Sequence, residues 1–196
     1  MISKRVKAAF AAAALLLSGT TLVSCDQAAV QQILTTVVST LMSSGQTKVY
    51  AGKATSLSMT GSANKSYWNA INTRTATAFS SASVQLQSGI TGTGTLVIPA
   101  FTDGKVTVNQ ITIYNLALTS SNNQASTNIS IGDSSTIDGS IVVGGVTYTA
   151  ANLYIETGVA TQQAINLTMT LYFASANDGD DYSKAINYTF TGNITQ

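Results

Sequence analysis

Cys25 is the residue with the most distinctive chemistry in this chain, because it is the only cysteine and there is no histidine. A thiol can act as a nucleophile, bind a metal or carry a lipid, but no disulfide can form without a second cysteine. Three basic residues precede an uncharged apolar stretch over 8–17, and small and polar residues fill 18–24. This order is typical of a secretory signal peptide, and its apolar part is shorter than the roughly 20 residues of a membrane-spanning helix.

The four residues that end at this cysteine, Leu22-Val23-Ser24-Cys25, resemble the lipobox of bacterial lipoproteins: an aliphatic residue, a tolerant position, a small residue and cysteine. The resemblance implies that the thiol of Cys25 receives a diacylglyceryl group. It also implies cleavage before Cys25 and acylation of the new amino group with a chain such as palmitate. Several acyl chains on one residue give stable membrane attachment, which a single chain does not. The alternative is a chance cysteine in a signal removed by an ordinary peptidase.

The remaining chain lacks the residues of the common catalytic sets. Without histidine, neither a Ser-His-Asp nor a Cys-His arrangement can be assembled, and the commonest general base and metal ligand is missing. Ser-Lys pairs are possible by count, but apart from Lys4 no lysine has the three-residue helical spacing that such enzymes use. We therefore predict a protein that is not an enzyme and needs no cofactor.

Three acids, Asp178, Asp180 and Asp181, lie close together in the sequence NDGDD. An oxygen-rich loop of this kind can hold calcium. The spacing does not fit the twelve-residue calcium loop, and no glutamate follows at the required distance. A solvated turn, where Asn, Asp and Gly are common, is the favoured interpretation, so we predict no metal site and keep these three acids as weak candidates.

The other acids and the glycine-rich stretch carry no clear site. Asp133 and Asp138 are predicted to be turn acids, and Glu156, the only glutamate, falls at a polar position of a strand pattern. Nothing in their spacing places two carboxylates on one face, as a glycosidase would require. The glycines of residues 89–96 have the wrong order for a dinucleotide-binding loop and precede a strand rather than a helix.

Tyr67 and Trp68 are adjacent and lie between two strand patterns. Exposed aromatic side chains in a loop could stack on a sugar or enter a partner protein. The favoured alternative is that Trp68, the only tryptophan, fills part of the core. These two residues are therefore weak ligand-binding candidates.

The charge balance argues against a nucleic-acid partner. The predicted signal removes three of the nine basic residues and none of the eight acids, so the mature chain has a formal charge of −2. Nucleic-acid binding needs a basic surface that displaces counterions. The mature chain of about 170 residues is long enough for one domain with its own core.

A single helix is predicted before the main domain. Residues 28–44 place apolar side chains on one stripe at 3.6 residues per turn, and Gly45 follows where a helix cap is expected. The opposite face is polar but has no Lys or Arg, which a helix lying on an anionic membrane usually carries. Packing against the domain is therefore favoured over a second membrane contact.

From residue 47 onward the apolar side chains follow a period of two. In 165–173 the odd-numbered residues are apolar, and in 185–192 Ile186, Tyr188 and Phe190 share one face. Such half-apolar strands belong to antiparallel sheets, so these two are expected to form a hairpin. Another tight hairpin is predicted at Gly144-Gly145, where positive φ angles are needed.

The stretch 105–119 has strand composition, but its alternation changes phase near Asn109 and again near Asn115. A one-residue slip moves side chains to the other face, so a bulge or turn is predicted at each point. A further strand ends near Pro99, and weaker ones are predicted over 47–59, 75–87 and 126–131. Eight to ten strands indicate an all-β fold, either an antiparallel up-and-down barrel or a β-sandwich.

The run LVIPAFTDGKVTVNQITIYNLALT, followed by a glycine-turn hairpin and a terminal INYTFTG, resembles the calycin-like, or lipocalin-like, β-barrel lipoproteins of Bacteroidota. The resemblance covers residues 47–196 and implies an up-and-down barrel of about eight strands that could enclose side chains or one small ligand. It brings no site motif with it.

These observations predict three segments: a signal peptide over 1–24, a lipid anchor with an amphipathic helix over 25–46, and a β-barrel domain over 47–196. The expected function is non-enzymatic binding of a small apolar or glycan ligand, or of an envelope protein, at a bacterial membrane. The alternative is a structural surface lipoprotein with a filled barrel, and a hydrolase is least favoured. Asp26 resembles an inner-membrane signal of enteric bacteria, but the Bacteroidota resemblance favours the outer membrane.

Overall fold

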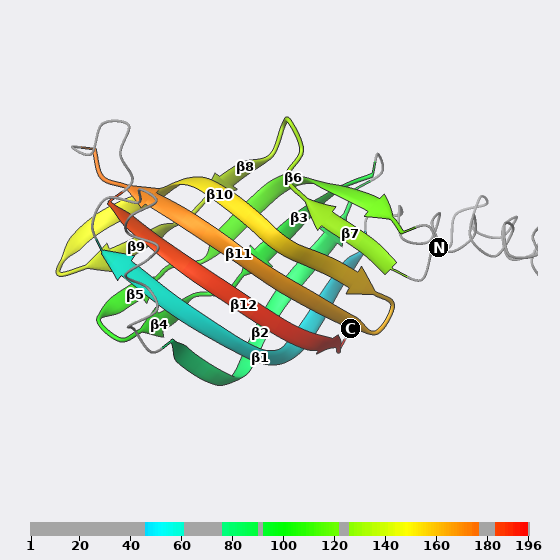
Figure 1. The fold of residues 1–196 in the computed structure, drawn as a ribbon, viewed down its shortest axis with the longest axis horizontal. Coiled ribbons are helices and arrows are strands. Elements are labelled where there is room, and N and C mark those ends of the chain that lie inside the picture. The colour runs from blue at the N-terminus through cyan, green and yellow to red at the C-terminus, as the bar shows by residue number, and fades with distance from the viewer. Residues whose placement is uncertain (1–45, 61–75, 90–91, 122–125, 177–182, 196) are drawn as a thin grey trace, which may run out of the picture. The chain divides into compact units, whose positions relative to one another are not determined.

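The computed structural model describes residues 46–60, 76–89, 92–121, 126–176 and 183–195, all within the unit Ser39–Gln196. Every regular element in these residues is a β-strand (Figure 1). The strands are β1 (Thr47–Thr60), β2 (Thr77–Ser88), β3 (Thr93–Ile98), β4 (Phe101–Asp103), β5 (Val106–Val108), β6 (Ile111–Ser120), β7 (Ser126–Ser130), β8 (Thr136–Asp138), β9 (Ser140–Val143), β10 (Val146–Thr161), β11 (Ala164–Ala174) and β12 (Lys184–Ile194). The predicted helix over 28–44 lies outside the described residues.

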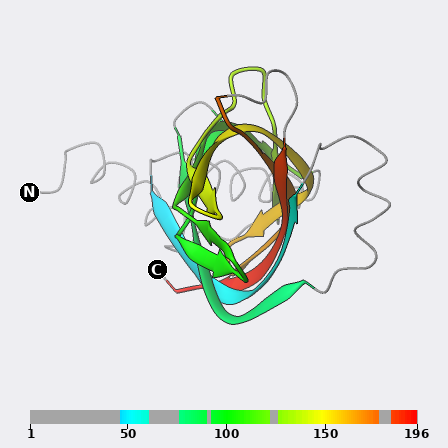
Figure 2. The same ribbon diagram turned by 90° about the vertical axis from the view of Figure 1, so that its left-hand side faces the viewer.

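Eight of the strands form a closed antiparallel barrel. Neighbours follow the order β1, β2, β3, β6, β7, β10, β11, β12, and β12 pairs with β1 to complete the ring. Figure 2 views this ring from one end. The fold is therefore the predicted up-and-down barrel, and closure rules out the sandwich alternative. Each ring strand pairs with the ring strands before and after it in the chain.

The barrel interior is lined by one face of each strand, as a period of two requires. All five odd-numbered residues predicted to face inward in β11 are buried, and so are Ile186, Tyr188 and Phe190 of β12. The β11–β12 pairing confirms the predicted C-terminal hairpin. The tight hairpin is also confirmed, with φ angles of 59° and 82° at Gly144 and Gly145.

Both predicted phase changes occur. A turn at 109–110 separates β5 from β6, and Asn115 adopts a φ of 54° where the β3–β6 register shifts. The strand that follows the Gly144-Gly145 turn is long, because β10 continues from Val146 to Thr161. Register shifts near 151 and 156 break the alternation in β10, which concealed its continuity in the sequence.

Three short strands, β9, β5 and β4, extend one end of the barrel. β9 pairs with the first residues of β10, β5 pairs with β9, and β4 pairs with β5, while β8 pairs with β6. We call this end, at the left of Figure 1, the Asp103 end. We call the opposite end, where β1 begins and β12 finishes, the Tyr50 end.

Candidate functional site

The structure does not describe the residues that the sequence put forward as sites. The lipid-attachment candidate Cys25, the aromatic candidates Tyr67 and Trp68, and the three acids at 178–181 all lie outside the described residues. They therefore remain predictions from the sequence alone.

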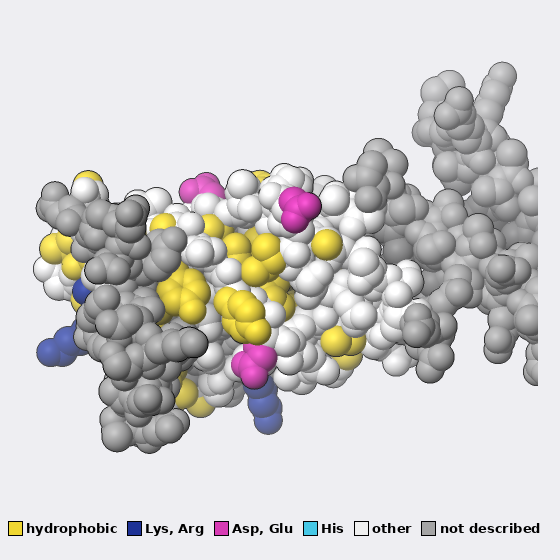
Figure 3. Space-filling model, turned by 45° about the horizontal axis from the view of Figure 1, so that its top comes forward, with side chains coloured by type: hydrophobic (Ala, Val, Ile, Leu, Met, Phe, Trp, Pro, Cys, Tyr) yellow, Lys and Arg dark blue, Asp and Glu magenta, His cyan; other side chains and the backbone are white. Residues whose placement is uncertain are grey.

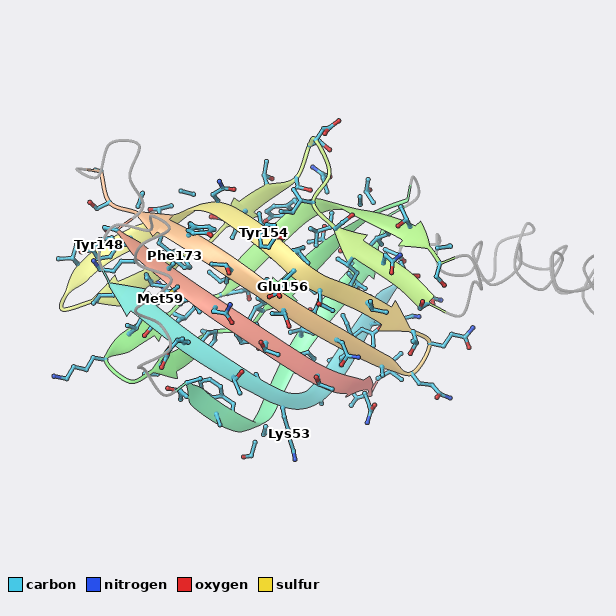
Figure 4. The ribbon with its side chains drawn as sticks, viewed as in Figure 1. Lys53, Met59, Tyr148, Tyr154, Glu156 and Phe173 are labelled. Carbon is cyan, nitrogen blue, oxygen red and sulfur yellow. The ribbon has the colours of Figure 1, made fainter. Side chains whose placement is uncertain are left out.

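The other acids considered from the sequence are exposed and lie on different elements. Asp133 is in a turn as predicted, whereas Asp138 lies in β8 rather than in a turn, and Glu156 is on the outer face of β10 (Figure 4). Within the described residues, no three His, Cys, Asp or Glu side chains gather where they could hold a metal.

Among the acids that the structure describes, Asp103 is the one that the fold buries, with 3% of its surface exposed. It lies at the end of β4, and its carboxylate faces β1 and β2. Oδ2 accepts hydrogen bonds from Ser58 N at 2.8 Å and from Ser56 Oγ at 3.0 Å, and Oδ1 accepts one from Thr77 Oγ1. Two hydroxyls and one backbone amide thus satisfy a carboxylate inside the barrel end.

Sequence reasoning missed this cluster for two reasons. The dipeptide Asp103-Gly104 has the composition of a tight turn, in which the acid is normally solvated. Ser56 and Ser58 fall in a strand that was only weakly predicted, although their spacing places them on the same face as Ala54. Two serines on the inner face of a strand were the available signal for a buried polar partner.

An aromatic cluster lies beside the carboxylate. The Phe101 ring meets Phe79 edge-on, with 5.4 Å between centroids, and lies 5.5 Å from the tilted ring of Tyr188. Burial raises the pKa of Tyr188 to about 12. The Tyr188 hydroxyl therefore stays neutral at neutral pH and does not supply a general base there.

Lys184 and Tyr148 also lie at the Asp103 end. The Lys184 ammonium is 4.5 Å from the centre of the Tyr148 ring, which is a cation–π contact, and it donates a hydrogen bond to Ser183 O at 3.2 Å. Figure 4 places Tyr148 at this end of the barrel. The cation is thus held against an aromatic ring at the mouth.

Large apolar side chains occupy the rest of the interior. The largest fully buried ones are Tyr50, Phe173, Phe190, Leu96, Ile98, Ile111, Ile113, Leu116, Ile141, Ile165, Leu167 and Met169. Tyr50 fills the opposite end of the barrel, where its hydroxyl points at the Thr161 carbonyl oxygen from 3.5 Å, and burial raises its pKa. In the described part of the chain, no buried side-chain nitrogen or oxygen lacks a hydrogen-bond partner.

Charged side chains are few on one face of the barrel (Figure 3). Figure 3 shows scattered hydrophobic side chains among uncharged polar groups on one face, with few charges. Tyr154 of β10 is 58% exposed, and Tyr172 lies nearby on β11. Burial, and secondarily the Tyr154 phenolate, raises the pKa of Tyr172.

The chain matches no protein-family model, no curated protein and no solved structure. Among the residues that the structure describes, no helix is long and apolar enough to cross a membrane. The function must therefore be argued from the barrel itself and from the predicted anchor.

Proposed function

We propose that this protein is a non-enzymatic bacterial lipoprotein with a calycin-like barrel, anchored through acylated Cys25 to the outer membrane. Its barrel would be filled by its own side chains, so that it serves as a rigid structural domain of the cell envelope. The sequence leaves open a filled barrel and a barrel with a ligand pocket, and we propose the filled barrel.

The observation that carries this proposal is the set of large side chains converging in the interior. Phe173 and Phe190 are fully buried on adjacent strands, and Leu167 faces Phe190 directly in the β11–β12 register. An eight-stranded barrel is just wide enough for side chains to fill it or for one small ligand to enter. Aromatic and branched residues at these positions favour filling.

A second candidate function, binding of a small molecule, is supported by one specific feature. Three hydrogen-bond donors, Ser56 Oγ, Ser58 N and Thr77 Oγ1, converge on one point at the Asp103 end. Ligand sites typically combine apolar walls with a few polar groups placed in this way. In the structure, the Asp103 carboxylate occupies that point.

A neutral fluorescent probe, N-phenyl-1-naphthylamine, tests whether the interior is filled. We expect no saturable fluorescence increase with the purified full chain, whereas a ligand-binding lipocalin serves as the positive control. Saturable binding that persists in the Tyr154→Ser variant would place the probe in the interior and contradict the filled barrel. An increase that disappears in Tyr154→Ser would come from the outer face and would leave the proposal standing.

A further inference from the structure

The β4–β5 hairpin, residues 101–108, lies outside the eight-strand ring. Within the described pairings, β4 bonds only to β5, and β5 bonds otherwise only to β9. At its tip, Gly104 has a φ of 62°, and a side-chain carbon added there would meet nothing within 4 Å. The hairpin therefore has one laddered edge and an exposed turn at Gly104 and Lys105.

Side chains, rather than a strand ladder, join the hairpin to β1 and β2. Asp103 accepts its three hydrogen bonds from these strands, and Phe101 packs between Phe79 and Tyr188. The two connections to the ring, at 99–100 and 109–110, are not strands. Segments with few ladder bonds open locally at lower free energy than the core does.

The base of the hairpin is fixed to β9 on one side. Asn109 donates from its backbone nitrogen to Ser140 O at 2.9 Å and from Nδ2 to Ser140 Oγ at 2.7 Å. Lifting the Asp103 side while the base stays in place would also expose Val106, which is buried in the core. Such a movement would leave the eight-strand ring intact.

The three donors belong to the ring, so they would keep their positions when the hairpin lifts. Removing the carboxylate would leave a buried amide and two hydroxyls without an acceptor, which is unfavourable. Water or another carboxylate would have to replace it as the acceptor of these hydrogen bonds. Next to this position, the rings of Phe79 and Tyr188 would lose the Phe101 ring that packs between them.

We propose that the β4–β5 hairpin is a strap whose Asp103 carboxylate occupies a position on the barrel that accepts the carboxylate of a small organic acid when the strap lifts. The apolar part of that acid would take the place of Phe101 against Phe79 and Tyr188. This goes beyond the proposed structural function and does not depend on the lipid anchor. It also differs from the neutral-probe test, because N-phenyl-1-naphthylamine has no carboxylate to accept the three hydrogen bonds that Asp103 accepts.

Hydrogen exchange of the full chain tests the strap. In Asp103→Ala we expect amide exchange in 101–108 to accelerate by about tenfold or more, with strand β11 unchanged. Asp138→Ala removes one carboxylate from an exposed position and should leave exchange in 101–108 as in the parent. Unchanged exchange in 101–108 of Asp103→Ala would overturn the strap.

If Asp103→Ala accelerates exchange in β11 as well, Asp103→Asn is the decisive variant. It keeps one acceptor oxygen and should accelerate exchange in the hairpin alone, by a smaller factor. Equal acceleration in the hairpin and in β11 would show that both open together, which contradicts a separate strap.

Formate tests the carboxylate position, because it replaces the group that Asp103→Ala removes. We expect formate to slow hairpin exchange in that variant in a saturable way, whereas chloride at equal ionic strength and neutral formamide have no effect. A formate effect no larger than that of chloride would contradict a position that accepts a carboxylate.

Octanoate tests the competition in the parent chain. We expect octanoate to accelerate exchange in 101–108 while β11 is unaffected, and 1-octanol to have no such effect. Hairpin exchange that does not respond to octanoate would overturn ligand entry, and an equal response to 1-octanol would mean that the carboxylate is not recognised.

Discussion

Ser56 and Ser58 put hydrogen-bonding groups on the inside of an otherwise apolar barrel. A buried polar group is costly unless it is paired, and here one carboxylate accepts from the Ser56 hydroxyl and from the Ser58 backbone nitrogen. Period-two alternation predicts which residues face inward, but it does not predict which distant residue supplies the partner. Ser58 and Asp103 lie 45 positions apart in the sequence, and only the placement of β4 beside β1 brings them together.

Ionisation of Tyr188 lowers the stability of the fold at alkaline pH. Burial raises its pKa from 10.0 to about 12, so the folded chain keeps a proton that the unfolded chain releases. The stabilising contribution is therefore complete below pH 10 and is lost as pH rises towards 12, amounting to about 2–3 kcal/mol. Tyr188→Phe should show a smaller loss of unfolding free energy between pH 10 and 12, measured by denaturant titration.

The control for this prediction is the same change at Tyr114, whose ring is 41% exposed. Tyr114→Phe should keep most of the alkaline loss seen in the parent. A loss as steep in Tyr188→Phe as in the parent would mean that this hydroxyl is not the titrating group.

The strands were the most predictable elements, because one face of each is apolar and the other polar. The hairpin at Gly144-Gly145, the turn after Val108 and the irregularity at Asn115 all followed from turn residues and phase changes. The length of β10 did not follow, because two register shifts interrupt its alternation. The pairing of β4 with β5, and of β5 with β9, escaped prediction, since strands of three residues carry too little pattern.

Gly52 and Gly192 allow β1 and β12 to approach closely. The two residues are paired, and a side-chain carbon at Gly52 would lie 2.0 Å from Thr191 O and 2.4 Å from Gly192 Cα. Because these are backbone atoms, Gly52→Ala should lower the free energy of unfolding by about 3 kcal/mol, measured by denaturant titration.

Gly132→Ala is the matched control, since its added carbon would lie at an ordinary 3.5 Å from Asn115 O. It should change stability by no more than about 0.5 kcal/mol. Equal effects of the two substitutions would show that close approach of β1 and β12 is not the reason for glycine at position 52.

At the scale of the whole molecule, the sequence predicts a barrel joined to a lipid through a short N-terminal segment. Alternation predicts an all-β fold that is either a barrel or a sandwich, and the structure shows the barrel, closed by the pairing of β10 with β11. The anchor depends on Leu22–Cys25 and the apolar stretch before it, which the structure does not describe. Chemistry at a processed cysteine is set by the enzymes that recognise it, so packing within this chain cannot reveal it.

The most direct test of the account is the membrane partitioning of Cys25→Ala when it is expressed in a bacterial host. The parent should fractionate with membranes, and mass spectrometry should find an acylated Cys25 at the mature N-terminus. The variant should leave the membrane fraction, because it has no thiol to receive the diacylglyceryl group. A variant that partitions with membranes as the parent does would contradict the lipid anchor.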